Sequence, residues 1–344
     1  MIKRIGKRTL ALENRPYLLG HAAAVGKKEG EGPLGERFDY VAKNDRMGQR
    51  SWELAESEFQ KTAIRLALRK AALPEHSLDL ILAGDLLNQC IGSFLASIHA
   101  DVPYLGQYGA CSTMAQGLAL GGCLVESGAA NRLLAAASSH FCSAERQYRF
   151  PLAYGGQRTP TAQWTATAAG AAVLGSSPMP GTVEPCDVRV THVLFGRMVE
   201  MGVTDAANMG AAMAPAACDT LSALLEDLGA QPRDFDCIVT GDLGHIGADL
   251  LLTLLRGDNI DLSPVYSDCG SLLFGSGQDA HAGGSGCGCS AAVLCGPLLR
   301  DMHRGRLRRL VFAGTGAMMS PTSIQQGQPI AGICHAVVLE RSEA

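Results

Sequence analysis

Hydrophobic and polar positions follow the same order twice along the chain. Residues 67–86 read ALRKAALPEHSLDLILAGDL, with apolar positions at helical spacing, a polar loop and a short β-rich run that ends in Gly-Asp. Residues 224–243 read LLEDLGAQPRDFDCIVTGDL and align with the first copy without a gap, so that Asp79 matches Asp236. Each copy therefore predicts a helix followed by a strand.

Two weaker similarities follow these units in the same order. Residues 132–136 (RLLAA) resemble residues 309–313 (RLVFA), and residues 171–174 (AAVL) resemble residues 336–339 (AVVL). Such short apolar runs are typical of strands that are buried on both faces beneath helices. We therefore predict an α/β fold of two duplicated halves, residues 1–185 and 186–344, with mixed sheets in a layered sandwich.

The composition agrees with a large packed core and excludes some functional classes. The 344 residues are 47% hydrophobic and 18% charged, and the net charge of −4 gives no reason to expect nucleic acid. The first residues lack the apolar segment of a signal peptide, and no run approaches the roughly 20 apolar residues that span a bilayer. We expect a soluble or at most peripheral protein.

The 12 cysteines favour reduced, buried thiols over disulfides. Most of them lie inside apolar runs, and no signal peptide directs the chain to an oxidising compartment. Cys287 and Cys289 form a C-x-C pair in a glycine-rich stretch, but no second pair stands at zinc-ligand spacing. We therefore expect no metal site.

Cys111 stands out because the sequence around it predicts a strand, a tight turn and a helix made of small apolar residues. The helix starts at or just beyond the cysteine, so the thiol would meet unpaired N–H groups and the positive end of the helix dipole. This arrangement is typical of a nucleophile on a sharp turn. The alternative is an ordinary buried cysteine packed at a turn.

Three motifs resemble those of the thiolase superfamily of condensing enzymes. They are Y-G-A-C-S-T at residues 108–113, A-A-G-A-A-V-L at residues 168–174 and H-A-G-G-S-G at residues 281–286. The resemblance spans almost the whole chain and implies a thiolase-like fold, a homodimer, Cys111 as the nucleophile and His281 as its partner. The alternative for His281 is a histidine hydrogen-bonded to the glycine-rich loop.

The acid and base groups of these enzymes are only partly present. No cysteine occupies residues 312–314, where thiolases carry their second one, and Asp242 stands where a condensing enzyme has histidine or asparagine. An ionised carboxylate would repel a developing oxyanion. His245 could substitute if its loop folds back. Cys111, His281 and His245 are thus the catalytic candidates, and the sequence favours a pocket that has lost its reaction.

A narrower resemblance joins five segments to the stage V sporulation protein AD family of spore-forming Firmicutes. The segments are residues 84–89, 108–115, 145–151, 160–165 and 278–290. The resemblance implies a subunit that binds dipicolinic acid (pyridine-2,6-dicarboxylate), with or without calcium. It also implies integral membrane subunits as partners and a place on the cytoplasmic side of, or peripheral to, the spore inner membrane.

A planar dicarboxylate needs hydrogen-bond donors, cations and a flat apolar face. The turn at Cys111 offers N–H groups at a helix start, and arginines suit bidentate carboxylate recognition. The residues that we expect to bind the ligand are Cys111, Ser112, Thr113, Arg146, Arg149, Arg158, Trp164, His281, Gly283, Gly284 and Ser285. The alternative is a dimer-interface loop whose arginines pair with acids.

We expect no cofactor, and any calcium would arrive with the ligand, because the chain has no EF-hand-like loop. The sequence leaves a second function open, an acyl-thioester condensing enzyme with Cys111 as nucleophile. A third reading is a scaffold for a membrane assembly.

Overall fold

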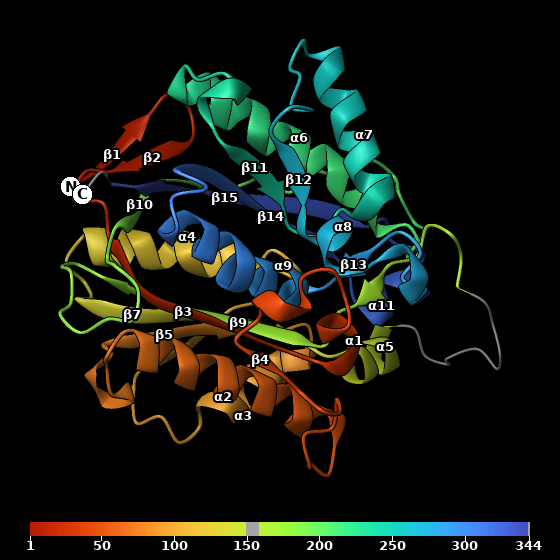
Figure 1. Cartoon of the computed structure of the whole chain (residues 1–344). Helices are drawn as coiled ribbons and strands as arrows, with labels where there is room; N and C mark the ends of the chain where they lie inside the picture. The colour runs from red at the N-terminus through yellow and green to blue at the C-terminus, as the bar shows by residue number, and fades with distance from the viewer. Residues whose placement is uncertain (149–157, 343–344) are drawn as a thin grey trace.

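A computed structural model describes residues 1–148 and 158–342 of the chain. Ten of the 13 strands of its main sheet form two sets of five, one from each half of the sequence (Figure 1). The first set, in order across the sheet, is β6 (Tyr104–Gly106), β5 (Leu80–Gly84), β7 (Arg132–Ser139), β9 (Ala168–Gly175) and β3 (Tyr17–Val25). The second set is β12 (Tyr266–Asp268), β11 (Cys237–Thr240), β14 (Arg309–Met318), β15 (Ala331–Arg341) and β10 (Val188–Leu194).

The two sets have the same pairing pattern. In the first, β6, β5 and β7 run parallel, and β9 and β3 then add antiparallel strands. In the second, β12, β11 and β14 run parallel, and β15 and β10 then add antiparallel strands. A single antiparallel pair, Arg189 with Tyr17, links β10 to β3. This repeated topology confirms the predicted duplicated α/β fold.

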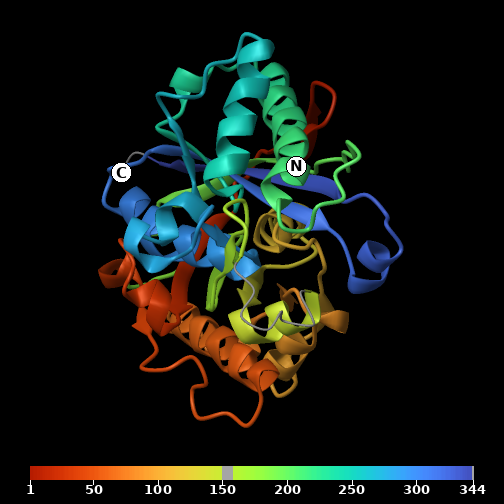
Figure 2. The same ribbon diagram turned by 90° about the vertical axis from the view of Figure 1, so that its right-hand side faces the viewer.

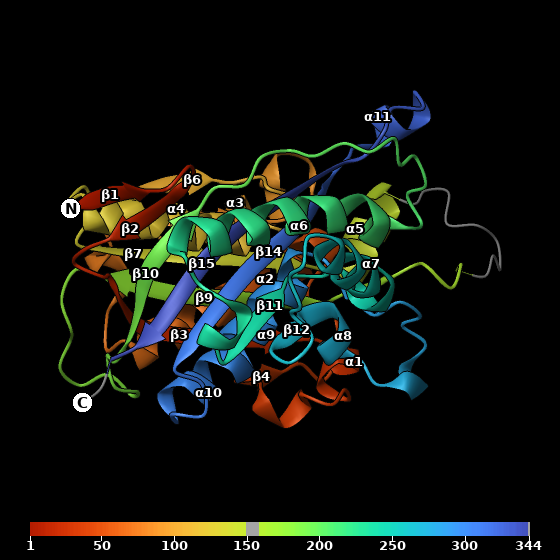
Figure 3. The ribbon, with the colours of Figure 1, turned by 90° about the horizontal axis from the view of Figure 1, so that it is seen from above.

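The helices and sheets alternate in layers. Helix α4 (Thr113–Glu126) and helix α9 (Cys287–Val293) lie between the two sets of strands, while α2 (Trp52–Lys70) and α3 (Ile91–Ser97) cover the outside of the first (Figures 1 and 2). Helices α6 (Met209–Leu228) and α7 (Gly244–Gly257) lie on the opposite outer side, with α6 packed on β14 and β15 (Figure 3). Strands covered on both faces must be apolar throughout, and all eight residues of β9 are buried.

Short elements complete the fold. They are β1 (Ile2–Ile5), β2 (Thr9–Leu12), α1 (Lys27–Gly30), β4 (Tyr40–Val41), α5 (Phe141–Tyr148), β8 (Trp164–Thr165), α8 (Cys269–Leu273), β13 (Gly284–Ser285), α10 (Leu299–His303) and α11 (Pro321–Gln325). Among the described residues, no helix combines the length and apolar character needed to cross a membrane. Strand β6 ends the first set, and one of its edges is unpaired among the described strands.

Candidate functional site

Cys111 lies in the tight turn between β6 and α4. The preceding Ala110 has a φ of 48°, a left-handed conformation that few non-glycine residues adopt, and the turn closes with the Ser112 N–H donating to the Gly109 carbonyl over 3.0 Å. The hydroxyls of Ser112 and Thr113 donate back to the carbonyls of Gly109 (2.6 Å) and Ala110 (2.7 Å). These two hydroxyls therefore stabilise the turn and do not offer their protons to a ligand.

The opposite half of the fold surrounds the Cys111 thiol. The thiol contacts the Asp242 carboxylate, the Gly286 N–H and the Ser285 hydroxyl. Asp242 follows strand β11, and its Oδ2 accepts hydrogen bonds from the Gly286 N–H (2.8 Å) and the Ser285 hydroxyl (3.3 Å). Its Oδ1 accepts from the Thr315 hydroxyl (2.9 Å). Asp242 thus fixes the glycine-rich loop against the thiol.

This environment keeps the thiol neutral. Burial, and after it the Asp242 carboxylate, raise the pKa of Cys111 well above its usual range, although Gly286 and Ser285 act in the opposite direction. Burial also raises the pKa of Asp242 itself. The turn geometry of a reactive cysteine is present, but the charge next to the sulfur opposes thiolate formation.

A narrow pocket of about 40 Å³, open in part to solvent, leads to the thiol. Its walls are mostly apolar, with two tyrosines and one carboxylate among the polar groups. The lining residues are Leu86, Tyr108, Ala110, Cys111, Ala144, Glu145, Tyr148, Thr165, Met209, Ser285, Ala317 and Met319. The Tyr108 and Tyr148 hydroxyls are 2.8 Å apart, and the Thr165 hydroxyl donates to Glu145 over 2.9 Å.

Sequence reasoning did not select most of these lining residues. Glu145 and Tyr148 belong to the segment whose arginines are predicted to bind the ligand. Met209 and Met319 come from parts of the second half that carry no motif. Of these lining residues, Tyr108 could have been selected from the sequence, because it lies three positions before Cys111 and therefore close to the turn.

The structure does not place His281 beside Cys111. Its ring contacts the Thr159 carbonyl through Nδ1 (2.8 Å) and Asp279 Oδ1 through Nε2 (2.9 Å) at the protein surface. Its backbone φ of 49° turns the chain at this point. The alternative for this histidine, a ring hydrogen-bonded to the glycine-rich loop, is not observed either, because one partner is the carbonyl of Thr159 in a distant segment and the other is the Asp279 carboxylate.

His245 also lies outside the pocket lining. It is the second residue of α7, its side chain is exposed, and its N–H donates to the Ala282 carbonyl over 2.7 Å. The loop therefore does not fold back to bring this imidazole to the sulfur. Neither histidine candidate reaches Cys111, since a motif fixes where a loop lies but not where each side chain points.

The predicted arginines and Trp164 lie away from the cavity, with Arg158 and Trp164 together in one place and Arg146 in another. Arg146 forms an ion pair with Glu53 on α2. Arg158 contacts Asp279 and lies 4.7 Å above the Trp164 ring, which also stacks on Phe141 with ring centres 3.9 Å apart. Arg149 lies outside the described residues. None of Arg146, Arg158 and Trp164 lines the cavity that leads to Cys111.

The glycines of the loop serve close packing. Gly284 and Ser285 form β13, which pairs with β8, and the Gly283 carbonyl accepts from the Trp164 N–H over 2.8 Å. A Cβ on Gly283 would lie 2.8 Å from the Gly270 carbonyl oxygen. Of the expected ligand contacts from this loop, Ser285 alone lines the cavity.

Comparisons with known proteins agree with this architecture. Residues 6–340 match the family model described as Stage V sporulation protein AD (SpoVAD). The chain is 40% identical to the stage V sporulation protein AD of Bacillus subtilis (strain 168) over 341 residues, 99% of each chain.

Two solved structures share the fold. The 3-oxoacyl-[acyl-carrier-protein] synthase III of Aquifex aeolicus VF5 superposes with a TM-score of 0.57 at 15% identity, over 94% of this chain and 99% of its own. A cerulenin-bound OleA of Xanthomonas campestris superposes with a TM-score of 0.58 at 16% identity, over 95% and 96%. The fold expected from the motifs, thiolase-like, is confirmed.

Proposed function

Since the chain belongs to the stage V sporulation protein AD family, we propose that it acts in sporulation by binding the calcium chelate of dipicolinic acid in the Cys111 cavity, without catalysing a reaction. The observation that carries this proposal is the carboxylate of Asp242 against the thiol. A condensing enzyme needs a thiolate and groups that stabilise an oxyanion, and Asp242 disfavours both.

The charge of the cavity favours the calcium chelate of dipicolinic acid over the free dianion. Its described lining contains the acidic Glu145, borders Asp242 and includes no lysine or arginine. A free dianion would meet negative charge there, whereas calcium dipicolinate is neutral overall. Calcium prefers oxygen ligands, and a carboxylate such as Glu145 is one that it could share with the chelate. Tyr108 and Tyr148 supply aromatic surface for the pyridine ring.

Calorimetric titration of the purified full chain tests this function. We expect saturable binding of calcium dipicolinate and at least about tenfold weaker binding of metal-free dipicolinate. Glu145→Gln should weaken chelate binding and leave or improve binding of the free acid, because the repulsion is removed. Glu36→Gln, an exposed carboxylate on another element, serves as control. Absence of heat with both ligands would contradict the proposal.

A second function rests on one observation. The Gly286 N–H and the Ser285 hydroxyl both contact the thiol and resemble the donors that bind an oxyanion. If the chain were an acyl-thioester condensing enzyme, incubation with acyl-coenzyme A would leave a mass increase of one acyl group. That adduct should disappear in Cys111→Ala.

We also propose that the chain is a homodimer that docks at the spore inner membrane with integral membrane subunits. The unpaired edge of β6 supports the dimer, because apolar side chains are exposed around it: Phe94 (42%), Ile98 (51%) and Leu105 (50%). An edge strand with exposed apolar neighbours invites pairing with another chain.

A further inference from the structure

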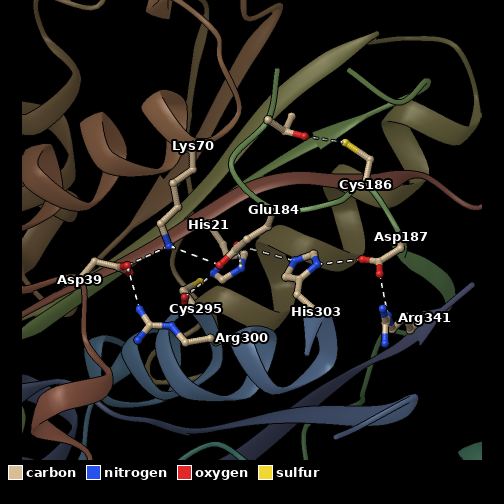
Figure 4. A network of polar contacts seen from close by, with 11 residues as sticks. His21, Asp39, Lys70, Glu184, Cys186, Asp187, Cys295, Arg300, His303 and Arg341 are labelled. Atoms are coloured by element: carbon tan, nitrogen blue, oxygen red, sulfur yellow. Dashed lines mark hydrogen bonds and ion pairs between the residues drawn. The ribbon is translucent and has the colours of Figure 1, made fainter. Parts of the chain in front are cut away.

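Three residues from distant parts of the sequence meet where the two halves join. His21 lies on β3 in the first half, His303 ends α10 in the second half, and Glu184 lies in the connection between β9 and β10 (Figure 4). One ring nitrogen of each histidine and one carboxylate oxygen lie within 4.8 Å of one another. None of the three lines the Cys111 cavity.

The outer ring nitrogens of both histidines have acceptor partners. Nδ1 of His21 is 2.5 Å from the Cys295 carbonyl oxygen, and Nδ1 of His303 is 2.8 Å from Asp187 Oδ1. A carbonyl and a carboxylate only accept, so each Nδ1 carries the proton. In a neutral ring each Nε2 is then a lone pair, and both lone pairs lie near Glu184. Metal-binding histidines are oriented by carbonyl or carboxylate acceptors in this manner.

The inner atoms of His21 and Glu184 face each other closely. His21 Nε2 is 2.7 Å from Glu184 Oε2, and within the described ranges 1–148 and 158–342 neither atom has any other hydrogen-bond partner. The His21 side chain is fully buried, so water cannot compensate freely. His303 Nε2 is 3.8 Å from the same oxygen. A lone pair that faces a carboxylate is repelled by it, so a cation shared by the two groups, either a proton or a metal ion, would stabilise the contact.

The neighbouring charged side chains form ion pairs with one another. Asp39 pairs with Lys70 (2.8 Å) and Arg300 (3.1 Å), and Asp187 pairs with Arg341 (2.6 Å). Lys70 lies 3.9 Å from the other oxygen of Glu184, Oε1. Among the described residues, the Oε2 atom has its charged contacts with the two imidazoles. Their ring planes are parallel with centres 5.3 Å apart, so that protonating both would place two like charges close together.

We propose that His21, Glu184 and His303 form a binding site for a divalent transition-metal ion of the zinc class, with water as the remaining ligand. Two imidazoles and one carboxylate suit zinc and its neighbours, whereas calcium prefers oxygen ligands alone. Bonds of about 2.0–2.1 Å in a tetrahedral site separate neighbouring ligand atoms by roughly 3.3 Å. The observed separations of 2.7 and 3.8 Å bracket that value.

The site would join three parts of the chain. Glu184 belongs to a largely exposed connection between the halves, and the metal would bind it to one residue of each half. The role is structural and independent of the ligand proposed for the Cys111 cavity.

Zinc binding to the purified, chelator-treated full chain tests this site. We expect one tight site per chain and a zinc-dependent rise in the melting temperature. Both should be lost in Glu184→Gln and His303→Asn, with affinity lower by more than about 100-fold. Asp187→Asn, which removes an outer partner only, should weaken binding about 10–100-fold. His76→Asn changes an exposed histidine elsewhere and should bind as the wild type does.

Cobalt distinguishes this site from the cysteines. Co²⁺ bound here should lack the thiolate charge-transfer absorption that a cysteine site produces. Zinc binding of equal strength in the wild type, Glu184→Gln and His303→Asn would overturn the proposal. So would a wild type that binds no zinc.

Discussion

The thiol of Cys111 and the carboxylate of Asp242 come from opposite halves of a duplicated fold and contact each other in a buried site. The Asp242 carboxylate disfavours ionisation of the thiol, because two negative charges repel each other strongly in so dry a space, whereas the neutral thiol hydrogen-bonds to the carboxylate and acts to lower its pKa, against the larger effect of burial. This pair therefore opposes the ionised sulfur that a cysteine nucleophile requires.

Replacing Asp242 with asparagine should make Cys111 more reactive. The substitution removes the negative charge that raises the thiol pKa, so more thiolate exists at a given pH. We expect several-fold faster alkylation by iodoacetamide at pH 8, measured by mass spectrometry of the Cys111 peptide. The control is Asp249→Asn on the exposed side of α7. An unchanged rate would mean that access, not charge, limits the thiol.

Glu29 should make the stability of the protein fall as the pH rises. Burial raises the pKa of this carboxyl from its usual value to about 8 in the folded state. A raised acid pKa means that the folded state holds the proton more tightly, so stability is lost between about pH 4.5 and 8.

Glu29→Gln removes this dependence. Relative to the wild type, the variant should gain up to a few kcal/mol in unfolding free energy between pH 5 and pH 8, since each pKa unit corresponds to about 1.4 kcal/mol. Urea denaturation at both pH values measures the change. A constant difference between variant and wild type at the two pH values would contradict this expectation.

Leu105→Asp should convert the expected dimer to a monomer. The side chain is 50% exposed on the edge strand β6, and a charge there would be buried without a partner on association. Light scattering after size exclusion measures the molar mass. Leu250→Asp on α7, at a residue that is 40% exposed, provides a matched control. A wild type that is monomeric at all concentrations would remove the basis of the proposal.

Gly286→Ala should destabilise the protein and disturb the cavity. Gly286 has a φ of 101°, and a Cβ there would lie 2.7 Å from Ser139 Oγ. Such backbone strain costs about 1–3 kcal/mol. The displaced backbone would also move the Gly286 N–H that donates to Asp242. Gly257→Ala, which meets no atom within 4 Å, should change the free energy of unfolding little.

The pattern of hydrophobic and polar residues was sufficient to predict the duplicated fold. The helix–strand units at residues 67–86 and 224–243 correspond to the ends of α2 and α6 followed by β5 and β11. Periodicity identifies such units because burial of one helix face or both strand faces is a local requirement on the residue order. The turn at Cys111 is likewise local, since it depends on a few consecutive small residues.

Tertiary structure alone decided which side chains surround the sulfur and which meet at the junction of the halves. His281 has the expected motif, but its loop directs the ring to Thr159 and Asp279. His21, Glu184 and His303 are far apart in the sequence and do not follow the spacing of a metal-binding motif, so the sequence did not predict that they meet. The physical reason is the same in both cases. Contacts between distant segments depend on packing angles and side-chain directions, which no short pattern of residues records.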